Sequence, residues 1–179
     1  AVHPLIYANA VVMPVAVLIV VILYWKRYHK AGTFKGILET GLITDRRLFR
    51  KEAVFFGALL VFLIWIMFYV FFIKDGVLYS GYTVYGDYAP HTAMMRSFSM
   101  GNNFPTEYPH FGGQDVKYHF MFQFFVGNLE FLGLRLDFAY NVVSVLVLLG
   151  FLIFLYHMAK RLTGSFAAGV LTVFFFFFR

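Results

Sequence analysis

Two aspartate–histidine pairs lie in a polar stretch that separates long apolar segments of this chain. Asp87 precedes His91 by four residues, and Asp115 precedes His119 by the same spacing. Residues four apart share a face of an α-helix, so each pair is expected to present a carboxylate and an imidazole together. Such groups can act as a general base or bind a divalent metal ion.

Other ionisable residues of the same stretch extend this set. The candidate metal ligands, for Mn, Mg or Zn, are Asp87, His91 and Asp115. The candidate groups for a substrate or a phosphate are His91, Arg96, Glu107 and His119. Because ionisable groups are costly near lipid, their gathering in one stretch of an apolar chain indicates a functional site.

Each residue also has a structural interpretation, and the sequence leaves both open. Asp87 and Asp115 stand where helix N-caps are expected, and aspartate is a favoured N-cap. Glu107, between two prolines, could simply order its loop. Arg96 could pair with a nearby carboxylate, which is the interpretation that we favour for it.

The composition indicates an integral membrane protein. The chain is 61% hydrophobic and 13% charged, with a mean hydropathy of +0.73. It has no cysteine, which excludes disulfides and thiolate metal sites. Its net charge of +6 is concentrated in one connection, so we expect lipid rather than nucleic acid as the partner.

Three apolar stretches are long enough to cross a membrane, which takes ~20 residues. They are Pro4 to Trp25, Ala53 to Ile73 and Phe138 to Ala159. A fourth stretch, Phe166 to Phe178, is about half that depth. Because a helix ending inside the bilayer leaves backbone groups without partners, we expect the chain to be a fragment of a larger protein.

The distribution of basic residues predicts the orientation. Eight lysines and arginines lie between the first two spans, and Lys160 and Arg161 follow the third. By the positive-inside rule these regions are cytoplasmic, and residues 74–137 face outward. The basic connection is interpreted mainly as a topology determinant, with an anionic-lipid patch as the alternative.

The predicted fold is an all-α, multi-span membrane bundle. Residues 1–73 form two spans with a basic cytoplasmic loop, 74–137 form an outer loop carrying the site, and 138–179 form a third span and the start of a fourth. Within the loop, Gly76 to Gly86 is expected to be irregular. Two short juxtamembrane helices are expected, from Asp87 to Met100 and from Asp115 to Leu132, joined by a loop over Phe104 to Gly113.

The loop sequence resembles the GT-C class of membrane glycosyltransferases, which includes protein O-mannosyltransferases and aminoarabinose transferases. It is similar in particular to a group of poorly characterised bacterial multi-pass proteins assigned to that class. The resemblance covers roughly Ala53 to Arg179. The motifs that carry it are Asp87-x-x-x-His91, Arg96-Ser97-Phe98-Ser99, Asn103-Phe104-Pro105-x-Glu107-Tyr108-Pro109 and Tyr118-His119-Phe120.

This resemblance implies a sugar donor linked to polyprenyl phosphate and an inverting transfer on the outer face of the bacterial cytoplasmic membrane. Asp87 matches the outer-loop aspartate that acts in the class as a base or helps to bind metal and acceptor. The chain departs from the pattern by having a span before the usual first one. The alternative is a non-catalytic subunit that assembles with other membrane subunits. The predicted spans contain no charged residue that would mark an ion path, so the sequence gives no support to a transporter.

Overall fold

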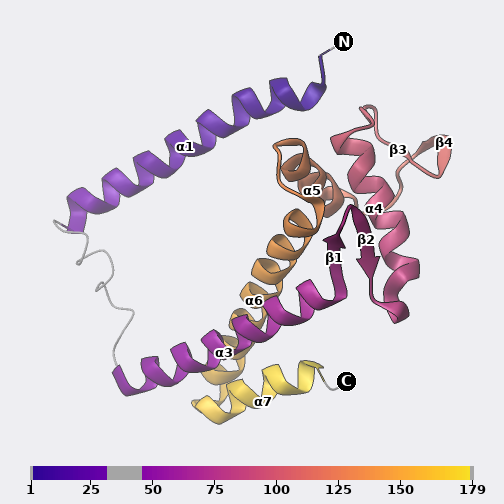
Figure 1. The fold of residues 1–179 in the computed structure, drawn as a ribbon. Coiled ribbons are helices and arrows are strands. Elements are labelled where there is room, and N and C mark those ends of the chain that lie inside the picture. The colour runs from indigo at the N-terminus through magenta and orange to yellow at the C-terminus, as the bar shows by residue number, and fades with distance from the viewer. Residues whose placement is uncertain (1, 32–45, 178–179) are drawn as a thin grey trace.

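The computed structural model describes residues 2–31 and 46–177, and these are mostly helical (Figure 1). The helices are α1 (Pro4–Ala31), α3 (Arg46–Val70), α4 (Tyr85–Ser99), α5 (Met121–Phe131), α6 (Leu136–Thr163) and α7 (Phe166–Phe177). The strands are β1 (Phe71–Lys74), β2 (Val77–Ser80), β3 (Glu107–Tyr108) and β4 (Phe111–Asp115), with a 3-10 turn at Tyr82–Val84. Part of the predicted basic connection, residues 32–45, lies outside the described residues.

Among the described residues, three helices are long and apolar enough to cross a membrane. They are α1 over Pro4–His29, α3 and α6. Helices α1 and α6 contain the first and third predicted spans, and α3 contains the second as far as Val70. An uninterrupted apolar run of this length predicts a helix without tertiary information. The fourth apolar stretch forms α7, which has 12 residues. The prediction of a helical chain is therefore confirmed, and the three helices suggest a membrane protein.

Helices α3, α6 and α7 pack around one apolar cluster. Its buried residues are Leu63, Val145, Leu152, Tyr156 and Val173. Gly169 of α7 faces the ring of Tyr156 so closely that an added Cβ would lie 2.5 Å from it. A glycine at this position therefore lets α7 fold back against α6, beside α3.

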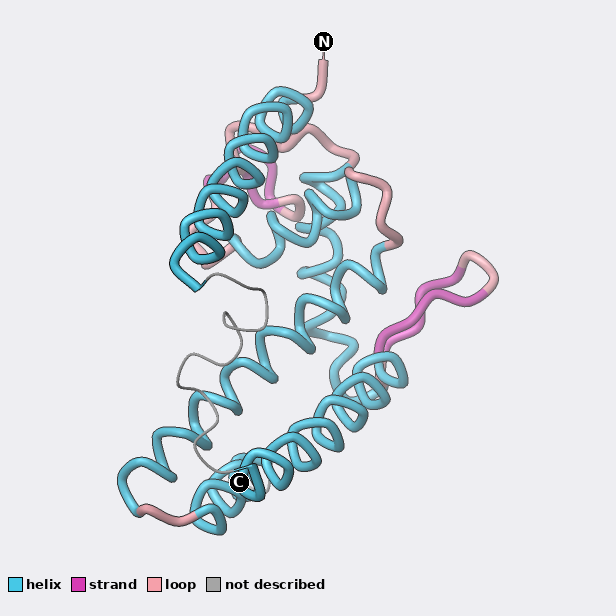
Figure 2. The backbone as a smooth tube through the Cα atoms, turned by 90° about the vertical axis from the view of Figure 1, so that its left-hand side faces the viewer, coloured by secondary structure: helices cyan, strands magenta, loops and turns pink. Residues whose placement is uncertain are grey.

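The chain leaves α3 as a β-hairpin, which corrects the prediction that the second span continues as helix to Ile73. Strands β1 and β2 pair antiparallel, joined by Asp75 and Gly76. Both turn residues have positive φ, 52° and 78°, as expected of a two-residue hairpin turn. Figure 2 shows the hairpin continuing from the last turn of the helix. The irregular segment predicted from Gly76 to Gly86 is therefore mostly regular.

Helices α4 and α5 pack side by side around a second cluster, with α6 completing it. Its buried residues are Met95, Val126, Leu136 and Ala139. At the point of closest approach, an added Cβ on Gly127 would lie 2.5 Å from the backbone oxygen of Met95. The two helices therefore pack as one layer. Helices α4 and α5, together with the β1–β2 and β3–β4 hairpins, are called here the outer layer.

The segment before α5 also differs from its prediction. Asp115 ends strand β4, which pairs with β3, and α5 begins only at Met121. The prediction that Asp115 opens a helix is wrong, because Glu107 and Asp115 are cross-strand partners in a short hairpin. The two hairpins also correct the all-α prediction of the fold class.

Helix α1 contacts the outer layer through its first turns. Asn9 and Asn128 exchange two side-chain hydrogen bonds of 2.7 and 3.0 Å, and His3 stacks on Phe131 with ring centroids 4.5 Å apart. Beyond these turns α1 runs apart from α3 (Figure 1). The paired amides and the stacked rings therefore attach the start of α1 to α5.

Candidate functional site

Helix α4 places Asp87 in its first turn, with an exposed side chain. Because the helix begins at Tyr85, Asp87 lies inside it rather than at the predicted N-cap position. No hydrogen bond or ion pair engages its carboxylate within residues 2–31 and 46–177. Asp87 is therefore an accessible carboxyl group at the start of α4.

His91, one turn further along α4, is oriented by α5. Its Nδ1 lies 2.7 Å from the side-chain amide of buried Gln123. When Gln123 Oε1 accepts from His91 Nδ1, its amide nitrogen donates to the backbone oxygens of Phe120 (3.2 Å) and His119 (3.3 Å). This arrangement satisfies every group, so Nδ1 carries the proton and Nε2 keeps its lone pair in the neutral ring.

The segment that leads into α5 brings Tyr118 toward this histidine. The Tyr118 ring lies 6.1 Å from the His91 ring and 3.8 Å from the His119 ring, measured between centroids. His119 is exposed and does not share a helical face with Asp115, because these residues belong to a coil and a strand. The structure thus groups His91 with Tyr118 and His119, and breaks the second predicted pair.

Arg96 binds the layer together. Its Nε lies 3.0 Å from Oε1 of Glu130, whose side chain is 8% exposed, and Ser99 donates to the other oxygen at 2.6 Å. The pairing with a carboxylate that we favoured from the sequence is present. Glu130, which the sequence did not single out as its partner, supplies the buried charge that α4 and α5 share.

Glu107 and Asp115 lie in the β3–β4 hairpin. The Glu107 carboxylate accepts from the backbone N–H of Gly113 at 2.8 Å, and Asn103 bonds both the N–H and the oxygen of the Glu107 backbone. Asp115 is exposed opposite Glu107. These contacts favour the structural interpretation of Glu107, in which its side chain orders the hairpin.

The described residues contain no group of three or more His, Asp or Glu side chains that could hold a metal ion. The three predicted ligands come from two elements: Asp87 and His91 from α4, and Asp115 from β4. A Mn, Mg or Zn site therefore stays a prediction, with no grouped ligand set to support it.

An open pocket of about 390 Å³ lies between β2 and α4. Its lining residues are Leu78, Ser80, Tyr88, Ala89, Thr92, Ala93 and Arg96. Asp87 does not line it, but directly precedes the lining residues Tyr88 and Ala89. The pocket thus offers three hydroxyl groups and Arg96, which lies on the same helix as Asp87 and also pairs with Glu130.

Tyr88 forms part of that wall in neutral form. Its ring stacks on buried Phe71 at 4.8 Å and meets Tyr140 at 5.5 Å. Burial raises the pKa of the Tyr88 hydroxyl far above its ordinary value, and the charge of Tyr140 and a hydrogen bond with it raise the pKa further. Tyr88 is therefore a hydrogen-bonding group rather than a base.

A polar node at the start of α6, formed by Asp137 and Asn141, fixes the hairpin that carries the pocket's other wall. Buried Asp137 accepts from Ile73 N–H at 2.9 Å, and Asn141 donates to the Phe71 oxygen at 2.7 Å. Arg135 donates to Asp137 at 2.6 and 2.8 Å, and this carboxylate raises the pKa of Arg135. The sequence analysis did not predict this node. The available signal was an aspartate and an asparagine four residues apart at the start of an apolar span.

Comparisons with protein-family models, with curated proteins and with solved structures found no match for this chain.

Proposed function

We propose that this chain belongs to a membrane glycosyltransferase of the GT-C type, which transfers a sugar from a polyprenyl-phosphate donor on the outer face of the membrane. The proposal rests on the resemblance of the loop motifs. The structural observation that carries it is the accessible Asp87, which has no partner within residues 2–31 and 46–177 and lies one turn before His91, whose ring is oriented by Gln123.

In the proposed reaction, Asp87 takes the proton of the acceptor hydroxyl. The acceptor oxygen forms a bond to the anomeric carbon as the bond from that carbon to the donor phosphate breaks, and the configuration inverts. Polyprenyl phosphate departs with the negative charge. A cation is required to stabilise this charge, and Arg96, which lines the pocket between β2 and α4, or His91 in its imidazolium form would supply it.

The proposed orientation places the outer layer on the outer face of a bacterial cytoplasmic membrane. It follows from the basic residues at the opposite ends of the spans, including Lys160 and Arg161 in the last turn of α6. A lipid-linked donor would then reach the pocket between β2 and α4 from the adjacent leaflet.

The test is transfer of labelled sugar from a panel of polyprenyl-phosphate sugars by the protein in lipid vesicles. We expect Asp87→Asn to lower the rate about 10²- to 10⁴-fold, the usual contribution of a general base. Asp75→Asn is the matched control, since Asp75 is an exposed aspartate at a turn that also suits asparagine. Equal rates in Asp87→Asn and wild type would contradict the catalytic role.

A non-catalytic subunit of a larger membrane complex is the second candidate. The observation that favours it is the internal pairing of Arg96 with Glu130 and the ordering of the hairpin by Glu107, which leaves these charges engaged within the chain. Absence of transfer with every donor, together with co-purification of a stable membrane partner, would favour this candidate.

A further inference from the structure

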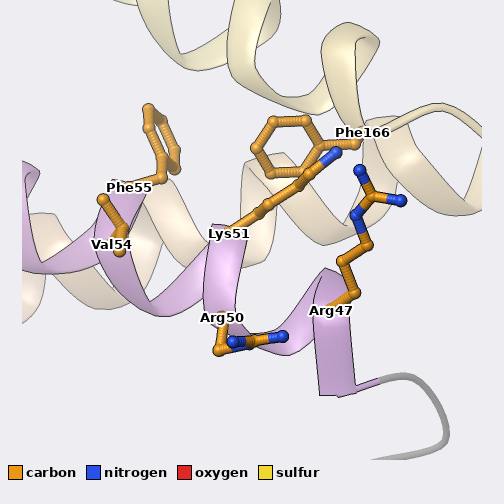
Figure 3. Close-up of a pocket in the computed structure, with 6 residues that line it drawn as sticks. All are labelled: Arg47, Arg50, Lys51, Val54, Phe55 and Phe166. Carbon is orange, nitrogen blue, oxygen red and sulfur yellow. The ribbon is translucent and has the colours of Figure 1, made fainter.

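Three basic side chains gather at the start of α3, at the opposite end of the molecule from the outer layer. Arg47, Arg50 and Lys51 line an open pocket of about 600 Å³, together with Val54, Phe55 and Phe166. In Figure 3, Lys51 and Arg47 extend from α3 toward Phe166 of α7, and Arg50 lies along the other side of the helix. The Lys51 Nζ lies 5.9 Å from the centre of the Phe166 ring.

The positive charge of these side chains is unfavourable for the start of the helix that carries them. The first turn of α3 contains no acidic residue, and the macrodipole disfavours basic side chains at a helix N-terminus. Glu52, an acidic neighbour on α3, is engaged by Lys160 at 2.6 Å and by the Tyr156 hydroxyl at 2.8 Å. Its charge is thus directed toward α6 and away from the basic pocket.

An apolar groove continues from the basic pocket between α3 and α7. Its volume is about 310 Å³, and its lining residues are Phe55, Ala58, Leu59, Phe62, Val170, Val173, Phe174 and Phe177. Phe55 lines both the pocket and the groove, so the two adjoin at this side chain. From Phe55 to Phe62 the groove follows α3 for roughly 10 Å, at 1.5 Å per residue.

We propose that the pocket and groove together bind one anionic phospholipid. The phosphate of the headgroup lies against Arg47 and Lys51, Arg50 adds positive charge at the edge of the pocket, and one acyl chain lies along the groove between α3 and α7. Two features favour this ligand. The basic side chains complement a negatively charged headgroup, and the adjoining apolar groove suits an acyl chain. A zwitterionic lipid fills the groove equally well but gains less from three cations, so the site discriminates by headgroup charge.

The experiment is a titration of the delipidated protein in a neutral detergent with dioleoylphosphatidylglycerol or dioleoylphosphatidylcholine, with bound lipid counted by native mass spectrometry. We expect phosphatidylglycerol to bind at least about tenfold more tightly than phosphatidylcholine. The triple variant R47Q/R50Q/K51Q loses this preference. The matched control K26Q/R27Q/R161Q removes the same number of charges outside the pocket and keeps it.

Ala58→Phe tests the groove separately, because the larger side chain fills it without touching the cations. We expect it to weaken phosphatidylglycerol binding, while glycerol 3-phosphate binds weakly to wild type and variant alike. Each variant is used after circular dichroism shows the helix content of wild type. Equal affinity for the two lipids, equal loss in both triple variants, or tight binding of glycerol 3-phosphate overturns the proposal.

Discussion

The two ends of this molecule are held together by different means. In the outer layer, hydrogen-bonded polar groups join distant segments: Arg96 with Glu130, and Asp137 with Ile73. In the bundle of α3, α6 and α7, contact is mainly apolar, and one polar cluster around Glu52 lies at its basic end. Polar bonds thus join α4 to α5 and β1 to α6, whereas α3, α6 and α7 are joined mainly by the fit of apolar side chains.

The largest effect is expected at the polar node. Asp137→Ala leaves the Ile73 N–H and Arg135 without their buried acceptor, and we expect a loss of about 3 kcal/mol in the free energy of unfolding. Asp137→Asn keeps an oxygen for Ile73 and is expected to lose about 1 kcal/mol. Unfolding by a denaturing detergent, followed by circular dichroism, measures both. Equal losses would show that charge, rather than the backbone contact, matters.

Substitutions of Gly127 and Gly169 allow a direct comparison of the outer layer with the bundle of α3, α6 and α7. Gly127→Ala places a Cβ against the Met95 backbone, whereas Gly169→Ala meets the side chain of Tyr156. Overpacking costs ~1–3 kcal/mol, and we expect the backbone clash to lie at the upper end and the ring contact at the lower. Hydrogen exchange should rise in α4 and α5 for the first variant, and in α7 for the second. The reverse order of stability would contradict this comparison.

Part of this arrangement could be predicted from the sequence. The spans and the helix containing Asp87 follow from apolar length and local signals, and Arg96 was expected to pair with a carboxylate. Strand β1 was missed because Phe71 to Ile73 extends an apolar run, although Asp75-Gly76 is a hairpin signal. The contact of Asp137 with Ile73, 64 residues apart, could not be predicted, since no local pattern specifies it.

A smaller effect is expected from the polar cluster of the bundle. Glu52→Ala removes the acceptor of Lys160 and Tyr156, and we expect a loss of about 1 kcal/mol, because the group is only partly shielded from water. Glu52→Gln keeps the hydrogen bond from Tyr156 and should lose less. Thermal unfolding in low and high salt separates the two contributions. A loss near that of Asp137→Ala would remove the contrast between the regions.

The smallest effect is expected at the hairpin turn. Asp75→Asn should change the free energy of unfolding by less than about 0.5 kcal/mol, since asparagine also adopts the positive φ that this turn requires. Asp75→Val, which disfavours positive φ, is the contrasting variant and should be less stable. Thermal unfolding of both variants beside wild type checks this. Equal stability of the two would show that the turn does not constrain the hairpin.

The polar node has a consequence for the pocket beside α4. Asn141 binds the backbone of Phe71, and the ring of Phe71 stacks on Tyr88, so a short series of contacts leads from α6 to the pocket wall. Membrane-spanning helices adjust their tilt to the thickness of the bilayer. If α6 spans the membrane, a change in its tilt would pass along these contacts to the ring pair of Phe71 and Tyr88. The thickness of the surrounding bilayer then becomes one determinant of the shape of the pocket.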